Sequence, residues 1–313
     1  EFMQASWDIE EVQAKGIQHL ASFVKDNNAF PYLLKFTKVI TFAMKTHVTS
    51  LKLQVDGCRL LLEILNQALA QGVVVALDES VASCLLATVR KHAGNEELLS
   101  LLCTILMMVS ASEVTAENLR KVGIIPDLLS ILRRFLRNDE ICFSCCGVLW
   151  SLAVSGNNGD QKVLEGAVHV TSAVLQKHLQ NGAVSESACS ALWALSLQGC
   201  LTDNDYEPTT TLLLDALRMN PGRAVLVKNG SLALASLLRV SEIAALTFIT
   251  DSKGSGIDLI KDVYHLHFND PGVVGAVCLL MKEMVQYDDV VLDMLSQKMD
   301  KLLSDIKIQF PFS

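Results

Sequence analysis

Apolar residues recur at helical spacing in a series of runs along the chain, and short polar segments separate these runs. Asp, Asn and Ser in the polar segments can cap a following helix by accepting its free amide protons. The pattern predicts an all-α protein whose helices are joined by tight polar turns, none long enough to be an interdomain linker. These joints lie at 93–96, 137–140, 156–160, 181–186, 202–208 and 251–256.

The runs repeat. Residues 141–156 read ICFSCCGVLWSLAVSG and residues 184–199 read VSESACSALWALSLQG. Trp150 and Trp193 are 43 residues apart, and the same step connects Cys146 with Cys189. Earlier steps of similar size extend the column back to Cys103 and Cys58. A period in the low forties is typical of helical solenoids.

Glycine marks a second column. Gly123 opens a run with Pro126 in its first turn, and Gly166 and Gly256 open similar runs. Residues 29–34 resemble a diverged early version. Glycine permits a sharp corner before a helix, and proline suits a first turn because no amide donor is needed there.

The two columns together define a single array covering residues 1–313. A helix over 8–26 comes before it, and a capping helix over 288–308 closes it. The predicted repeats are 27–70, 71–112, 113–155, 156–199, 200–241 and 242–287.

The segments GIIPDLLSIL (123–132) and ALWALSL (191–197) resemble the second and third helices of an armadillo repeat, with HEAT repeats the nearest competitor. The resemblance singles out no member of the family. It implies a right-handed α-solenoid of about six three-helix repeats plus end caps. Its third helices are expected to line a concave face that binds extended or helical peptides.

Composition narrows the class of partner. Half of the residues are hydrophobic and only 6% are aromatic, which favours helices packed on helices. The net charge of −8 disfavours nucleic acid and membrane surfaces and favours basic or amphipathic protein segments. Nine cysteines inside apolar runs predict buried thiols and a cytoplasmic location, with the nucleus as the alternative. Glu1-Phe2 before Met3 is typical of a cloning site, so we expect a fragment of a longer protein.

No constellation for chemistry emerges. Cys142, Cys145 and Cys146 lie on one predicted helix without a second ligand pair, and His265 and His267 point apart on another. Nucleotide, nucleophile and kinase motifs are absent from the sequence. We therefore expect no enzyme activity, no metal and no cofactor.

Armadillo proteins that bind extended peptides place a Trp on the third helix and an Asn four residues later. Here only the first member of the Asn column, Asn66, keeps the amide. Without the ladder, binding of an extended peptide by that mode is not expected. The Trp column reads Leu62, Met107, Trp150, Trp193 and Ala235, and the Asn column reads Asn66, Ala111, Val154, Leu197 and Arg239.

What remains is an apolar stripe of Met107, Trp150, Val154, Trp193 and Leu197. If exposed, it suits an amphipathic helix laid into a groove. If covered, it is core that a neighbouring segment or a second copy closes.

A basic cluster is the other surface feature. Arg133, Arg134 and Arg137, near Arg120 and Lys121, form either a solvated face at a helix C-terminus or a contact for an acidic partner segment.

The leading hypothesis is a non-catalytic scaffold or adaptor that binds a partner segment on its groove. One alternative is a regulatory armadillo arm of a larger enzyme, such as a protein kinase or kinase-like protein. Another is a homodimerising module that uses the apolar residues of its closing helix, so monomer and homodimer both stay open.

Overall fold

The computed structural model describes residues 2–24, 30–156 and 162–309, with only the backbone described for residues 2 and 30–34. These residues form helices throughout, with no strand among them, which confirms the all-α prediction. They divide into two compact units, Glu1–Gly156 and Asn157–Ser313, here called the N-terminal and C-terminal units.

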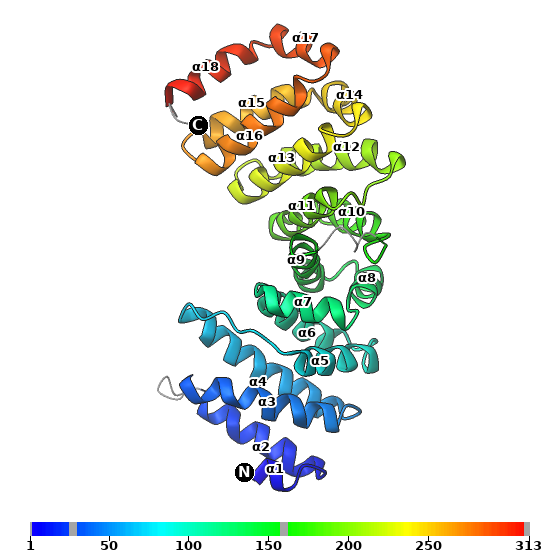
Figure 1. The fold of residues 1–313 in the computed structure, drawn as a ribbon, viewed down its shortest axis with the longest axis vertical. Helices are drawn as coiled ribbons and strands as arrows, with labels where there is room; N and C mark the ends of the chain where they lie inside the picture. The colour runs from blue at the N-terminus through cyan, green and yellow to red at the C-terminus, as the bar shows by residue number, and fades with distance from the viewer. Residues whose placement is uncertain (1, 25–29, 157–161, 310–313) are drawn as a thin grey trace. The chain divides into compact units, whose positions relative to one another are not determined.

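The N-terminal unit contains nine described helices, and seven of them form two layers (Figure 1). Layer A runs through α2, α4, α6 and α9, each packed on the next, and layer B through α3, α5 and α7. The helices are α1 (Phe2–Ala5), α2 (Glu10–Phe23), α3 (Phe30–Thr46), α4 (Leu51–Ala70), α5 (Glu79–Lys91), α6 (Glu96–Ser110), α7 (Glu113–Lys121), α8 (Ile125–Arg134) and α9 (Asp139–Val154).

The C-terminal unit follows the same plan. Its layer A is α11, α13 and α16, and its layer B is α10, α12 and α14. The helices are α10 (Ala167–Lys177), α11 (Gly182–Leu197), α12 (Asp203–Met219), α13 (Ala224–Leu238), α14 (Glu242–Thr250), α15 (Gly256–His267), α16 (Pro271–Met284), α17 (Asp288–Ser296) and α18 (Met299–Gln309).

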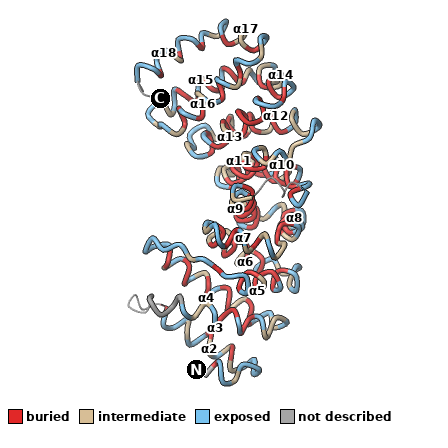
Figure 2. Tube along the Cα trace, viewed as in Figure 1, coloured by how far each residue is buried: buried red, intermediate tan, exposed pale blue. Residues whose placement is uncertain are grey.

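Burial follows from this layering. The middle helices of layer A have a layer A neighbour on each side and layer B behind them, and buried residues lie on the faces that helices turn towards one another (Figure 2). On α6, eight of the fifteen residues are buried, among them Leu99, Cys103 and Leu106. A helix that is apolar nearly all round is stable in water only when its neighbours cover it in this way.

Asparagine begins three layer A helices. The side-chain oxygens of Asn95, Asn138 and Asn181 accept hydrogen bonds from the amide three residues later, at 2.9, 2.9 and 3.3 Å. The three asparagines are 43 residues apart, so the repeat includes the cap itself. These bonds confirm the helix starts predicted at 93–96, 137–140 and 181–186, and caps at Thr202 and Ser255 confirm those at 202–208 and 251–256. Residues 157–160 of the joint at 156–160 lie outside the described residues.

Side chains also reach backbone carbonyls about one repeat earlier. His92 Nε2 lies 2.7 Å from Val48 O, Asn118 Nδ2 donates to Leu77 O at 2.9 Å, and Asn220 Nδ2 donates to Leu179 O at 2.8 Å. These partners are 41 to 44 residues apart. Each bond satisfies a carbonyl oxygen that accepts no hydrogen bond within a helix. It thereby connects one repeat to the previous repeat.

The number of helices differs between the predicted repeats. Within the described residues, 113–155 and 242–287 each contain three helices, whereas the other four ranges contain two. In 71–112 a non-helical segment comes before α5, where Thr115 Oγ1 accepts from the Leu77 amide at 2.8 Å. The side chains of α7 thus supply partners for backbone that a first helix would otherwise have satisfied.

The predicted glycine corners hold at two of three positions. Gly123 and Gly166 have φ of 76° and 78°, a region that favours glycine, and Pro126 lies in the first turn of α8. Gly256 was wrongly assigned to a corner, because the positive φ of 128° belongs to Gly254. Gly256 instead begins α15, where a Cβ would lie 2.6 Å from the buried ring of Phe248.

The ends also depart from the prediction. The first long helix, α2, begins at Glu10 and ends at Phe23, inside the predicted range of 8–26. The predicted closing helix over 288–308 is two helices, α17 and α18, because Lys298 has a φ of 59° that an α-helix cannot contain. Residues 27–29 lie outside the described residues.

Two glycines provide a matched test of packing. We expect Gly256→Ala to lower the free energy of unfolding by about 1–3 kcal/mol, because the new methyl group overpacks against Phe248. Gly275→Ala, in the exposed part of α16 with no atom within 4 Å of its Cβ, should instead raise it by about 0.5–1 kcal/mol. Urea unfolding followed by circular dichroism measures both, and equal effects would contradict this account.

Candidate functional site

The N-terminal unit presents an apolar surface at the C-terminal ends of α6 and α9. Trp150 and Val154 are 39% and 58% exposed and lie four residues apart on one face of α9. Met107 is half-buried at the equivalent position of α6, which packs directly on α9. We call Met107, Trp150 and Val154 the Trp150 surface. Within the described residues, no segment of the chain fully covers it.

Asn66 occupies the position in α4 that corresponds in the repeat pattern to Ala111 and Val154. It is exposed close to the C-terminal end of α4, the layer A neighbour of α6, and Leu62 one turn earlier is half-buried. A single exposed Asn side chain can contact the backbone of a bound peptide at one position only.

The remaining predicted groove residues belong to the C-terminal unit. Trp193 is half-buried on α11, and Leu197, four residues later, is 49% exposed. Arg239 is exposed just after α13, but Ala235 is only 1% exposed and offers no surface. The apolar surface of this unit is therefore confined to α11 in that column.

An acidic edge lies at the N-terminal ends of α6 and α9, whereas the Trp150 surface lies at their C-terminal ends. Glu96 and Glu97 begin α6, and Asp139 and Glu140 begin α9, where carboxylates interact favourably with the helix dipole. Ten residues separate Glu140 from Trp150, which corresponds to about 15 Å along the helix. The joints predicted at 93–96 and 137–140 mark these helix starts, but no pattern in the sequence indicates that their carboxylates share one edge.

At least three of these carboxylates already have side-chain partners. Glu97 Oε1 lies 2.6 Å from Arg59 Nη2, Glu140 Oε2 accepts from Ser100 Oγ at 2.7 Å, and Glu96 Oε1 accepts from Asn138 Nδ2 at 2.7 Å. These contacts lie at the surface, where they contribute about 1 kcal/mol or less and are readily exchanged. The face of α6 and α9 therefore combines an apolar end with an acidic end.

The predicted basic cluster divides in the structure. Arg120 donates to Leu152 O at 3.0 Å and to Ser155 Oγ at 2.8 Å, and thus caps the C-terminal end of α9. Arg134 donates to Ala93 O at 3.2 Å. Arg133 and Arg137 are exposed, Arg133 in the last turn of α8. Two of these five basic residues, Arg120 and Arg134, thus hold neighbouring segments together.

Most thiols are buried, as the sequence predicts. Seven of the nine cysteines are buried, and Cys200 and Cys278 are half-buried. Burial raises the pKa of the Cys142 and Cys189 thiols to about 12. Cys145, one residue from the predicted column, is the thiol that meets Cys103, with their sulfur atoms 3.4 Å apart. Among the described residues no group of three or more metal-ligating side chains is placed to hold an ion.

Thiol reactivity tests this burial. With an aromatic disulfide reagent, we expect at most Cys200 and Cys278 to react in the native protein and all nine cysteines after unfolding. Burial raises the pKa of Cys200 to about 11, so its thiolate fraction and its rate should rise roughly tenfold from pH 8 to pH 9. Rapid reaction of more than two thiols at pH 8 would show that the layers open.

A hollow of about 610 Å³ lies between α10 and α12 in the C-terminal unit. Its lining includes His169, Glu207 and two carboxylates that are already engaged, Asp205 and Asp215. Asp205 accepts from the Thr202 amide and hydroxyl at 2.8 and 2.7 Å in a capping box. This hollow therefore offers little free negative charge for a cation.

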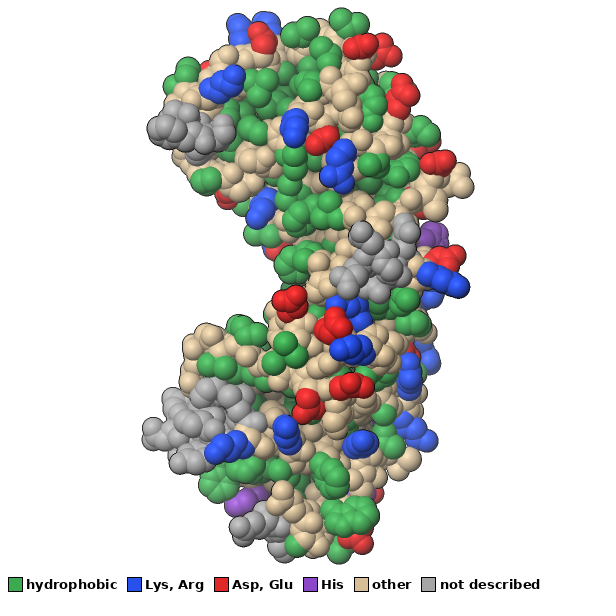
Figure 3. Space-filling model, viewed as in Figure 1, with side chains coloured by type: hydrophobic (Ala, Val, Ile, Leu, Met, Phe, Trp, Pro, Cys, Tyr) green, Lys and Arg blue, Asp and Glu red, His purple; other side chains and the backbone are tan. Residues whose placement is uncertain are grey.

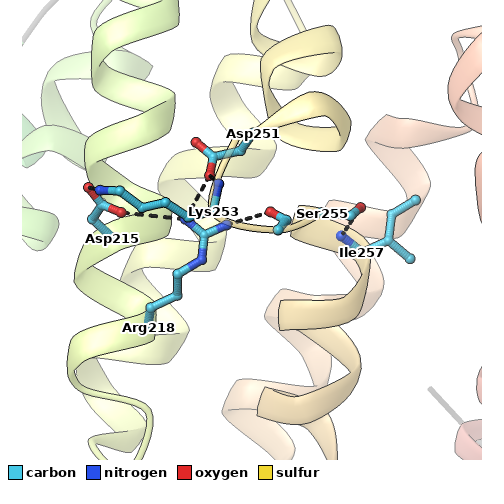
Figure 4. Close-up of polar contacts among 7 residues, drawn as sticks. Asp215, Arg218, Asp251, Lys253, Ser255 and Ile257 are labelled. Carbon is cyan, nitrogen blue, oxygen red and sulfur yellow. Dashed lines mark hydrogen bonds and ion pairs between the residues drawn. The ribbon is translucent and has the colours of Figure 1, made fainter.

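Asp215 belongs to the network in Figure 4, which joins α12 to the turn between α14 and α15. Arg218 Nη1 lies 2.9 Å from Asp251 and 3.4 Å from Asp215, and Lys253 Nζ lies 2.6 Å from Asp215. Arg218 Nη2 also donates to Gly254 O at 2.6 Å. The Asp251 side chain is only 3% exposed, so its charge depends on these donors. The network holds a turn in place.

Removal of Arg218 tests that role. Arg218→Ala leaves the Asp251 carboxylate poorly paired and should lower the free energy of unfolding by about 2 kcal/mol. Arg90→Ala breaks a more exposed pair with Asp127 at 2.9 Å and should cost at most about 1 kcal/mol. Urea unfolding of both variants decides between them, and a smaller loss for Arg218→Ala would refute the structural role.

No known family model matches this chain. Within the described ranges, every helix is too short or too polar to cross a membrane.

Proposed function

We propose that this chain is a non-catalytic protein-binding module, and that the face formed by α6 and α9 binds a helical segment of a partner protein. The observation that carries the proposal is the exposure of Trp150 and Val154 on a helix whose other faces are buried. Tryptophan is among the residues that contribute most to protein interfaces when a partner removes them from water.

The proposal includes the way in which the helices are arranged. We infer an armadillo-like solenoid, supported by the packing of each layer A helix on the next and by side-chain bonds that span about one repeat. A single repeat of this kind cannot bury its apolar faces alone. Stacked neighbouring repeats cover these faces and leave one helix face free for contact.

The charges on the α6–α9 face favour a particular partner. Four carboxylates stand at one end of the two helices and the Trp150 surface at the other. An amphipathic helix with Leu, Ile or Phe on one side and Lys or Arg further along it satisfies both ends. The backbone amides and carbonyls of a bound helix form hydrogen bonds within the helix itself. Such a partner therefore suits a face that offers few side chains for bonding a peptide backbone.

Trp150→Glu tests the surface. We expect it to weaken binding by at least about 30-fold, equivalent to a hot-spot loss of about 2 kcal/mol, while the helical circular dichroism signal is unchanged. Proteins captured from a lysate by the wild-type chain and lost from this variant should contain basic amphipathic helices, as identified by mass spectrometry and confirmed with synthetic peptides.

The matched control is Val114→Glu, which places the same charge at a 61% exposed apolar position of α7. Its captured proteins should be those of the wild type. An identical set for Trp150→Glu would remove the Trp150 surface as the binding site. Leu197→Glu reports separately on the C-terminal unit, where the exposed apolar residue is on α11.

A further inference from the structure

A second surface lies at the start of the N-terminal unit, where two hollows of about 480 and 790 Å³ meet. They share Trp7, Lys38 and Phe42 in their linings, and together we call them the N-terminal hollow. Trp7 is 52% exposed and Phe42 is 53% exposed. Figure 3 shows apolar side chains together with Lys or Arg over the segment that Figure 1 labels α1 to α3.

The backbone under Trp7 is held from two sides. Gln13 Nε2 donates to Met3 O at 2.9 Å and to Ser6 O at 2.8 Å, and His47 Nε2 lies 3.0 Å from Trp7 O. The turn between α1 and α2 is thus tied both to α2 and to the end of α3. An exposed aromatic ring on a fixed backbone loses little freedom when a partner covers it, which favours binding.

Phe42 shares its face of α3 with two lysines. Lys38, Phe42 and Lys45 are four and three residues apart, a spacing that places them in one line along a helix. The Lys38 side chain is 77% exposed, and Lys45 is exposed as well. The line presents an apolar ring with a positive charge on either side of it.

Asp78 is the one carboxylate among the residues that line the two hollows, and it is occupied. Asp78 accepts from the Val81 amide at 3.1 Å as the cap of α5, and lies 3.2 Å from Lys38 Nζ. The Val81 amide and Lys38 lower the pKa of Asp78, so it stays ionised at neutral pH. Among the charged residues that line the two hollows, two lysines and one aspartate leave a net charge of +1, although the whole chain has a net charge of −8.

We propose that the N-terminal hollow binds an acidic amphipathic helix of a partner protein, with Leu, Ile, Phe or Trp packed on Trp7 and Phe42 and Asp or Glu beside Lys38 and Lys45. Two facts carry the assignment: the exposed apolar rings stand on backbone that is held in place, and the charge around them complements a negative partner. The α6–α9 face has the opposite charge, so the two surfaces select different helices.

A random 16-residue peptide library displayed on phage, selected on the whole chain, tests this assignment. Phe42→Glu and Trp150→Glu chains serve as counter-selections that separate the two surfaces. Peptides that require Phe42 but not Trp150 should show apolar residues at helical spacing and a net negative charge. Failure to enrich such peptides, or enrichment of neutral or basic ones at Phe42, overturns the proposal and leaves the Trp150 surface untouched.

Fluorescence polarisation with the best peptide then tests the charges. Lys38→Glu with Lys45→Glu should weaken binding at least tenfold at low salt, and the loss should shrink as salt rises. Lys91→Glu, at an exposed position at the end of α5, is the matched control and should leave binding unchanged. Equal losses in all charge variants overturn the lysine contact.

Light scattering distinguishes the remaining occupant. If the chain forms a dimer that Phe42→Glu converts to a monomer, a second copy fills the hollow and the proposal is wrong. A mass independent of concentration and unchanged in Phe42→Glu supports it. Because Trp7, Lys38 and Phe42 are exposed, their substitution should leave the helical signal of the chain intact.

Discussion

The structure depends on one constraint: the layer A helices are apolar on too many faces to be stable alone. α13 buries eleven of its fifteen residues, and α6 buries eight of its fifteen. Only a helix on either side, with layer B behind, removes these faces from water. On α9, the large apolar residues that stay exposed are Trp150 and Val154, which share one face of the helix.

Polar contacts then determine how successive repeats align with one another. Apolar burial is not directional, so it permits neighbouring helices to slide. The bonds from His92, Asn118 and Asn220 to carbonyls about one repeat earlier have a defined geometry that only one register satisfies. Arg218 has a similar effect, because it attaches the turn before α15 to α12.

The two surfaces of the N-terminal unit illustrate how one net charge conceals local differences. Carboxylates at the starts of α6 and α9 are placed there by the helix dipole, and they make that face acidic. Lysines on the outer side of α3 make the N-terminal hollow positive. A partner is attracted by the charge within about a Debye length of its binding site, and not by the sum over the chain.

Local rules explain what the sequence by itself determined. Helix starts at asparagine, corners at Gly123 and Gly166, and burial of cysteines in apolar runs all depend on a few neighbouring residues. Tertiary structure decided the rest, because each case depends on a residue distant in the sequence or on the path of the backbone. Gly256 is needed because the ring of Phe248 lies against it, and Cys145 meets Cys103 because adjacent helices touch along their edges. The break at Lys298 and the hollow between Trp7 and Phe42 have no periodic signal, since they arise at chain ends where a stacked neighbour no longer repeats.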